Sequence, residues 1–202
     1  QLYLKGRHAV ATYADWDTAI RYLQQAIARD PNYALAYDGL AYYYAMTVDW
    51  RMPGNEALPR AREAAEKALQ LDPSLAEAHG WLAYVYWWYD HDYAATRREF
   101  ETAIAMLPDS ALMHAAYGTY LVAAGQTEEG LAEGRRAVEL DPLSHEHTAS
   151  LGMSLYFAHR YDEAITQLRT ALAINPDYWF AREWLGRAYA RVRTVFDIFA
   201  AT

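Results

Sequence analysis

The sequence contains no cysteine. This absence excludes disulfide bonds, thiolate metal sites and a cysteine nucleophile, although a missing residue does not identify the compartment. No apolar run approaches the roughly 20 residues of a membrane-spanning helix, so we expect no membrane insertion. We expect a cytoplasmic location, or a periplasmic one if a parent protein is anchored in a membrane. Because the chain begins at Gln1 without a signal-like segment, we expect it to belong to a longer protein.

Positive charge is also scarce. The chain has 18 basic and 26 acidic residues, a formal net charge of −8, and no block of lysines or arginines. A protein that binds nucleic acid needs a positive surface that replaces the phosphate counterions. The composition therefore predicts no nucleic-acid binding. Apolar residues make up 53% of the chain and charged residues 22%, which excludes a disordered acidic tail.

Motifs for phosphate, nucleotide or ester chemistry are missing. The sequence has no GxxxxGK phosphate loop, no GxGxxG dinucleotide motif and no GxSxG nucleophile elbow. Seven histidines are present, but His145 and His147 are two positions apart. On a helix such residues point in different directions, whereas helical metal-ligand pairs are three or four positions apart. We therefore expect no catalytic residue, no metal site and no cofactor.

Five of the seven prolines are regularly spaced. Pro31, Pro73, Pro108, Pro142 and Pro176 are separated by 42, 35, 34 and 34 residues, and Asp or Asn precedes four of them. An Asp-Pro or Asn-Pro step ends a helix, because the residue before proline is pushed out of the α region. The spacing predicts a repeating unit of about 34 residues in which a helix ends before each proline.

Positions counted from these prolines repeat the same residue types. Five residues before the proline stand Ala26, Ala68, Ala103, Ala137 and Ala171. Twelve residues before it stand Ala19, Ala61, Thr96, Gly130 and Ala164. Ten residues after it stand Ala41, Ala83, Gly118, Gly152 and Gly186, and the positions nine and thirteen after it are Leu or Tyr. Antiparallel helices approach closely where small residues meet, while large residues one turn away fill the grooves. The pattern predicts helix–turn–helix units.

This pattern resembles the tetratricopeptide repeat, a 34-residue unit with an aromatic residue, Leu-Gly/Ala, Tyr, Ala, Phe, Ala and a closing Pro in this order. Thr96 and Gly130 replace an expected Ala, and Gly134 stands where Phe is usual. The resemblance implies an all-α, right-handed superhelical solenoid of about six repeats, forming a single domain over residues 1–202. The predicted repeats are 1–33, 34–75, 76–110, 111–144, 145–178 and a partial sixth at 179–202.

Five segments are similar to one bacterial subgroup of these repeats, namely residues 3–8, 31–37, 56–61, 97–100 and 141–144. In that subgroup the repeats form the C-terminal sensory or scaffold half of signalling proteins. The N-terminal halves are winged-helix transcription regulators, adenylate cyclases or serine/threonine kinases. The resemblance implies a regulatory input module within a larger bacterial signalling protein.

Three further features lie between or beside the repeat positions. The second repeat is eight residues longer than the 34-residue unit, and the excess lies at residues 47–55. Such an insertion is either a tolerated surface loop or a functional one. His79 and His114 share the position six residues after a proline, so we interpret them as packing residues between neighbouring repeats. Asp90-His91-Asp92 joins the two helices of the third repeat, and we expect a helix N-cap and a solvated histidine there.

In repeats of this kind the first helix of each pair lines a concave groove. Its positions 2, 5, 9 and 12 lie on a face away from the packing face. Transferred to this chain, with their aromatic neighbours, these positions predict an apolar and aromatic partner-binding groove that includes Tyr42, Tyr84, Trp87, Trp88, Ala115, Thr119, Met153, Tyr156, Phe157 and Phe180. Trp87 is the predicted main contact of a site over repeats three to five. Any single aromatic residue of the set can instead pack against its neighbours.

The groove lacks the Lys, Asn and Arg set with which chaperone-binding members of the family hold a C-terminal carboxylate. We therefore expect a protein or peptide partner with an apolar or aromatic segment. The leading interpretation is a non-enzymatic protein–protein interaction and regulatory module. The alternatives are self-assembly into homo-oligomers through the groove or the open C-terminal end, and an enzyme built on a helical-repeat scaffold.

The C-terminal residues carry a separate prediction. Residues 193–202 are expected to begin the second helix of the sixth repeat. Val195, Phe196, Ile198 and Phe199 are apolar at helical spacing, whereas solenoids normally end in a polar capping helix. We therefore expect either a homodimer contact through this helix or a flexible end.

Overall fold

Helices are the only regular elements of the chain as far as it is described. The computed structural model describes residues 1–11, 16–48 and 51–200, without the side chains of residues 7–11 and 193–200. Within these ranges there is no strand, and Val48 and Met52 form an isolated bridge. The predicted all-α fold is confirmed.

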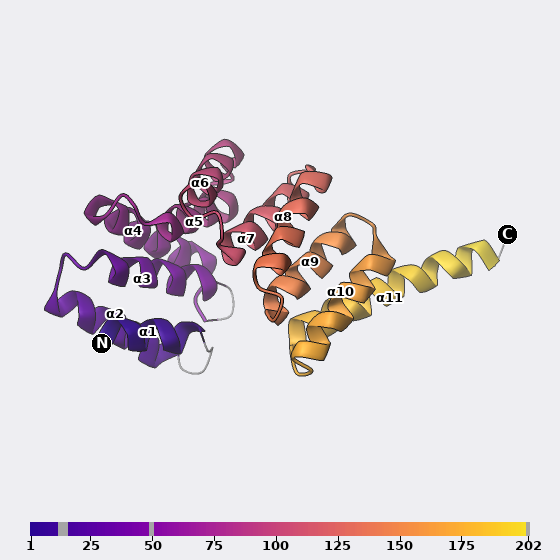
Figure 1. Cartoon of the computed structure of the whole chain (residues 1–202), viewed down its shortest axis with the longest axis horizontal. Coiled ribbons are helices and arrows are strands. Elements are labelled where there is room, and N and C mark those ends of the chain that lie inside the picture. Colours follow the sequence, from indigo (N-terminus) through magenta and orange to yellow (C-terminus); the bar gives the residue numbers. More distant parts are fainter. Residues whose placement is uncertain (12–15, 49–50, 201–202) are drawn as a thin grey trace. The chain divides into compact units, whose positions relative to one another are not determined.

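The helices form hairpins that follow the predicted repeats, in two compact units (Figure 1). The first unit, Gln1–Pro108, contains α1 (Leu2–Ala11) with α2 (Trp16–Arg29), α3 (Ala34–Met46) with α4 (Gly54–Leu71), and α5 (Ala76–Val85), continued by the π-helix η1 (Tyr86–Asp90), with α6 (Tyr93–Met106). The second unit, Asp109–Thr202, contains α7 (Ala111–Ala123) with α8 (Thr127–Leu140), α9 (His145–Phe157) with α10 (Tyr161–Ile174), and α11 (Trp179–Ala200). The single right-handed solenoid over residues 1–202 stays a prediction.

The small residues meet where the repeat pattern places them. A Cβ atom added to Gly118 of α7 would lie 2.7 Å from the carbonyl oxygen of Gly130 in α8, and one added to Gly130 would lie 2.6 Å from the carbonyl oxygen of Gly118. These positions are ten residues after one proline and twelve before the next. The two helix backbones therefore approach as closely as the pattern predicts, because neither residue has a side chain between them.

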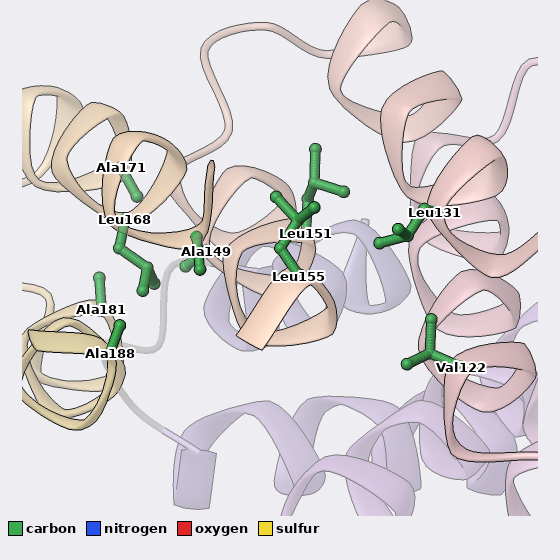
Figure 2. Close-up of a cluster of buried hydrophobic side chains, with 10 residues drawn as sticks. Val122, Leu131, Ala149, Leu151, Leu155, Leu168, Ala171, Ala181 and Ala188 are labelled. Carbon is green, nitrogen blue, oxygen red and sulfur yellow. The ribbon is translucent and has the colours of Figure 1, made fainter. Parts of the chain in front are cut away.

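Neighbouring repeats complete each other's core. In the second unit, buried side chains from five helices converge into one cluster (Figure 2). The cluster consists of Val122, Leu131, Ala149, Leu151, Leu155, Ala164, Leu168, Ala171, Ala181 and Ala188. Leu151 of α9 lies against Gly134 of α8, where an added Cβ would be 3.0 Å from its Cδ1. Gly134, which replaces the usual Phe, thus leaves room for a leucine of the next repeat.

Local chemistry starts and ends the helices. The side chains of Asp92, Ser110 and Ser144 accept hydrogen bonds from backbone N–H groups three residues further on, which caps α6, α7 and α9. The N-cap at Asp92 is confirmed, and His91 is exposed, as expected. At the end of α4, the hydroxyl and backbone N–H of Ser74 donate to Asp72, and these bonds lower the pKa of the Asp72 carboxyl.

The insertion in the second repeat is partly helical. The helix α4 has 18 residues, whereas α2, α6, α8 and α10 have 14 each. Part of the excess therefore adds a turn at the start of α4, where Ala57 and Leu58 are buried. Residues 49–50 of the insertion lie outside the described residues. The segment is thus not a loop throughout, and its functional role stays open to test.

The C-terminal prediction of a second helix from residue 193 is wrong. The helix α11 runs without a break over 22 residues, Trp179–Ala200. In the fourth and fifth repeats the first helix ends at Ala123 or Phe157, and a residue with positive φ, Gly125 or His159, follows two positions later, 17 residues after the proline. The corresponding residue after Pro176 is Arg193, which continues the helix because it does not favour the left-handed region. The four apolar side chains of this segment lie outside the described side chains.

Candidate partner-binding surfaces

In the first unit, aromatic side chains cluster at the end of α5 and in η1. The ring of Trp88 lies 4.7 Å from that of Trp87 and 6.0 Å from that of Tyr84, measured between ring centroids. Trp88 is 51% exposed, whereas Trp87 and Tyr84 are half-buried. We call these three residues the η1 cluster. The structure therefore brings three predicted groove residues together, and Trp88 rather than Trp87 presents the larger exposed surface.

The π-turn that carries this cluster absorbs one extra residue. His91, which has a positive φ and follows η1, lies 18 residues after Pro73. Gly125 and His159, the residues with positive φ that follow the first helices of the next two repeats, lie 17 residues after their prolines. A π-turn closes its hydrogen bonds over five residues instead of four, so it accommodates one residue more than an α-turn. This explains why the third repeat has 35 residues instead of 34. The proline spacing shows that one residue is in excess but does not show where it lies.

Arg62 of α4 holds the π-turn from the side. Its guanidinium pairs with Asp90, the last residue of η1, and lies 5.7 Å from the ring centroid of Tyr86 and 5.9 Å from that of Tyr89. The hydrogen bond to Asp90 raises the pKa of the Arg62 guanidinium. A charged pair between half-exposed groups together with two cation–π contacts ties both ends of η1 to α4. No motif in the sequence points to Arg62.

A second aromatic pair in this unit is hydrogen-bonded to a buried carboxylate. Tyr42 of α3 stacks on Trp81 of α5, with ring centroids 4.9 Å apart. The indole Nε1 of Trp81 donates to Oδ1 of Asp38 over 3.0 Å, and Asp38 is only 1% exposed. Although Asp38 occupies a groove position of the repeat, it lies in the interior, where a polar group requires a hydrogen-bond partner. Asp38 thus joins two first helices beneath Tyr42.

In the second unit, the aromatic residues gather around Trp184 of α11. Its ring centroid lies 5.3 Å from that of Tyr156, 5.1 Å from that of Phe157 and 6.1 Å from that of Phe180. Phe157 is 53% exposed. We call these four residues the Trp184 cluster. The groove positions missed Trp184, although Trp81 and Trp184 share the position eight residues after a proline, a signal that was available in the sequence.

Two arginines border the Trp184 cluster. The guanidinium of Arg187 lies 4.7 Å from the ring centroid of Trp184 and pairs with Glu183 of the preceding turn. The Nε of Arg191 donates to the hydroxyl of Tyr156 over 3.2 Å. The surface is therefore apolar at its centre and cationic along α11, which the purely apolar groove of the sequence prediction did not include.

The small and less bulky residues of the predicted groove offer little surface. Ala115 is buried, and the hydroxyl of Thr119 donates to the carbonyl of Ala115 over 3.0 Å, so its polar group is already satisfied. Met153 is half-buried. The predicted site extends over residues of both units, and its continuity from repeat three to repeat five stays a prediction.

The two histidines that share a repeat position each contact a glutamate of their own hairpin. Nδ1 of His79 in α5 lies 2.8 Å from Oε2 of Glu99 in α6, and Nδ1 of His114 in α7 lies 2.5 Å from Oε2 of Glu133 in α8. They are packing residues, as predicted, but these hydrogen bonds join the two helices of one repeat rather than neighbouring repeats. Among the described residues, no three His, Asp or Glu side chains gather as a metal site would require.

None of the helices, as far as their residues are described, has the length and apolar character needed to cross a membrane.

The comparisons with known proteins identify the family. A model of the tetratricopeptide repeat matches residues 88–145 and 150–193, about half of the chain. The chain belongs to the tetratricopeptide repeat family. This family is generally a non-enzymatic fold for protein–protein interaction.

Similar sequences and structures give further context. The chain is 31% identical over 144 residues to the transcriptional regulator HilA of Salmonella typhimurium and of Salmonella paratyphi A. The match covers 70% of this chain but only 26% of the regulator. The thermophilic repeat protein TTC0263 of Thermus thermophilus shares 17% identity with a TM-score of 0.77, covering 93% of this chain and 97% of that one.

A second solved structure is YrrB, described as a repeat protein with an unusual peptide-binding site. It shares 19% identity with a TM-score of 0.55, over 90% of this chain and 89% of that one. At these identities the structural likeness shows the fold, and it supports the confirmed prediction of tetratricopeptide hairpins.

Proposed function

We propose that this chain is a non-enzymatic regulatory module that binds an apolar or aromatic segment of a partner protein through its first helices. The observation that carries the proposal is the exposure of large aromatic side chains in two clusters, with Trp88 at 51% and Phe157 at 53%. Tryptophan and other aromatic side chains bury a large area at little cost in rotamer entropy, which is why they dominate binding hot spots. The membership in an interaction family agrees with this use.

The regulatory part of the proposal draws on the similarity to HilA. That protein is a transcriptional regulator, and the chain spans about a quarter of its length. A repeat module attached to a DNA-binding output would sense a protein partner rather than DNA. The net charge of −8 supports this division of roles, because nucleic-acid binding requires a positive surface.

The two clusters differ in the chemistry that they offer a partner. The η1 cluster presents aromatic faces, whereas the Trp184 cluster adds Arg187 and Arg191 beside its rings. An acidic residue next to an aromatic or leucine side chain would fit the second surface, because a carboxylate can pair with the arginines while the apolar group covers the rings.

The test uses peptides selected from a displayed random library against the chain, with affinities measured by fluorescence anisotropy. We expect Trp88→Ala or Phe157→Ala to weaken the binding of the selected peptides by about 2 kcal/mol, roughly thirtyfold in the dissociation constant. Tyr93→Ala is the matched control, because Tyr93 is 55% exposed but lies on a second helix. Peptides that bind all three variants as tightly as the unmodified chain would refute the site.

Trp87 requires separate treatment. Because its ring is half-buried against Trp88, Trp87→Ala removes packing inside the η1 cluster as well as contact surface. Trp88→Ala therefore isolates binding better, and the melting temperature of each variant shows how much of the effect is structural.

A further inference from the structure

An open cavity of about 780 Å³ lies between α3 and α4, the two helices of the second hairpin (Figure 1). Its lining residues belong to these two helices alone. The buried part of the lining consists of Leu40, Tyr44 and Ala64, which are 9%, 9% and 6% exposed. Small-molecule sites in proteins typically have volumes of about 300–1,000 Å³ and apolar or aromatic walls. We call this space the α3–α4 cavity.

The cavity lies where two other repeats place a polar pair. In those repeats a glutamate nine residues before the proline contacts a histidine six residues after the preceding proline, as Glu99 with His79 and Glu133 with His114. In the second repeat the glutamate position is Ala64 and the histidine position is Tyr37. The hydroxyl of Tyr37 donates to the carbonyl of Pro31 over 3.3 Å. The methyl group of Ala64 thus leaves open the space that a glutamate side chain occupies in the other two repeats.

Two basic side chains border the cavity beside Ala64. Arg60 stands four residues before Ala64 and Lys67 three residues after it, so both share its face of α4. Glu63 and Glu66, one residue before Ala64 and two after it, project away from that face. Both carboxylates are exposed, and in the described structure neither forms an ion pair with Arg60 or Lys67. The inner edge of the cavity is therefore cationic, whereas its outer edge is acidic.

Neither basic group is neutralised by a carboxylate of the hairpin. The guanidinium of Arg60 lies 5.9 Å from the ring centroid of Tyr44 and has no ion pair among the described residues. Nζ of Lys67 donates to the side-chain oxygen of Gln70 over 3.0 Å, which leaves two N–H donors of the ammonium for another acceptor. An anionic group placed over Ala64 would therefore meet a cation on either side, next to an aromatic ring.

We propose that the α3–α4 cavity binds a small aromatic carboxylate. The ring of this ligand packs on the wall formed by Leu40 and the two tyrosines, while its carboxylate pairs with Arg60 and accepts a hydrogen bond from Lys67. A second anionic group would approach the two exposed glutamates, so the ligand carries a single negative charge.

The extent of the cavity favours a small molecule over a long peptide segment. Along α4 it reaches from Arg60 to Gln70, which corresponds to about 15 Å at the rise of an α-helix. None of its lining residues belongs to the η1 cluster or the Trp184 cluster. The site is therefore separate from the surfaces proposed to bind a partner protein.

The probe is 2-naphthoate, titrated into the isotopically labelled full chain and followed by nuclear magnetic resonance. We expect saturable binding, with chemical-shift changes concentrated in α3, in α4 and at the side chain of Arg60. The matched control ligand is 2-naphthylmethylammonium, which has the same ring system and the opposite charge. It should bind about fivefold more weakly, the effect of losing one exposed ion pair.

Two variants of the chain test the named contacts. Arg60→Gln removes the exposed cation and should weaken 2-naphthoate binding about fivefold, whereas Arg169→Gln, at an exposed arginine of α10, should leave it unchanged. The double variant Tyr37→His with Ala64→Glu builds the polar pair of the third and fourth repeats into the cavity. It should weaken binding about tenfold, because a carboxylate then fills the position of the anion. If its melting temperature shows that this variant does not fold, Arg60→Gln still tests the site.

Three results would overturn the proposal. These are no saturable binding of 2-naphthoate, equal affinities for the naphthyl anion and cation, and equal affinities of the unmodified chain and Arg60→Gln. Shift changes in η1 and α11 instead of α3 and α4 would place the probe on the aromatic clusters and would also refute the site. Trp88→Ala and Phe157→Ala should leave 2-naphthoate binding unchanged, so this proposal and the proposed function can fail separately.

Discussion

Replacing glycine with alanine at one position of three repeats should stabilise the chain in one repeat and destabilise it in the other two. Gly118, Gly152 and Gly186 each stand ten residues after a proline, inside a first helix. In a helix interior, Gly→Ala ordinarily raises the free energy of unfolding by about 0.5–1 kcal/mol, because alanine loses less backbone entropy on folding. At Gly186, among the described residues, nothing beyond the chain neighbours and the backbone of its own helix lies within 4 Å of the added Cβ. We therefore expect Gly186→Ala to stabilise the chain by about 1 kcal/mol.

At the other two positions the added methyl group meets a neighbouring helix. At Gly118 the contacts are the carbonyl oxygen of Gly130 at 2.7 Å and the backbone nitrogen of Gly134 at 2.9 Å, which no side-chain rotation relieves. At Gly152 the contact is Cγ of Leu168 at 2.6 Å, a branch point that moves only with its whole side chain. Overpacking of this kind costs about 1–3 kcal/mol. We expect both variants to be destabilised, and Gly118→Ala more strongly.

The assay is urea unfolding followed by circular dichroism, with melting temperatures as a second measure. For a chain of this size, 1 kcal/mol corresponds to about 2–4 °C. A destabilised Gly186→Ala variant would mean that another part of the molecule packs against Gly186. A stabilised Gly118→Ala variant would mean that α7 and α8 do not approach as closely as described.

Three further predictions concern single side chains. Burial raises the pKa of Tyr178 to about 12, so the folded chain keeps the phenolic proton at a pH where the unfolded chain, with an ordinary pKa near 10, loses it. The free energy of unfolding should therefore fall by about 2–3 kcal/mol between pH 10 and 12. Tyr178→Phe should reduce this fall in melting curves at pH 8.5–11.5. Asp90→Asn removes the carboxylate that pairs with Arg62 and should cost about 1 kcal/mol, with a change in the near-ultraviolet dichroism of the tryptophans that Glu101→Gln, at an exposed pair, does not produce. Asp92→Ala removes the N-cap of α6 and should lower the free energy of unfolding by about 1 kcal/mol in urea, whereas an unchanged value would show that the cap contributes nothing.

The aromatic surfaces were only partly predictable. The repeat positions identified Tyr156 and Phe180, because helical periodicity places each on the groove face of its helix, and Phe157 was included as the neighbour of Tyr156. They missed Trp184 at the centre, since a ring between two groove positions reaches its neighbours only through the packing of α11 against α9. The π-turn was also beyond reach, because one excess residue can enter a loop as easily as a helix. In this chain the excess residue lies in the helix, where Arg62 contacts Asp90 and two tyrosine rings of the π-turn.

The sequence by itself determined the hairpins, their order and their contact points. Helix ends depend on local signals such as an Asp-Pro step, and close approach depends on small residues at a repeated spacing, so both can be read along the chain. Only the tertiary structure showed which of the small residues at these positions is covered by another helix. Gly118 and Gly186 occupy the same position in the repeat. An added Cβ would meet the backbone of α8 at Gly118, whereas at Gly186 it would meet no other helix within 4 Å in the part of the chain that the structure describes. Burial depends on a second helix being present and placed, and no residue of the first helix specifies that.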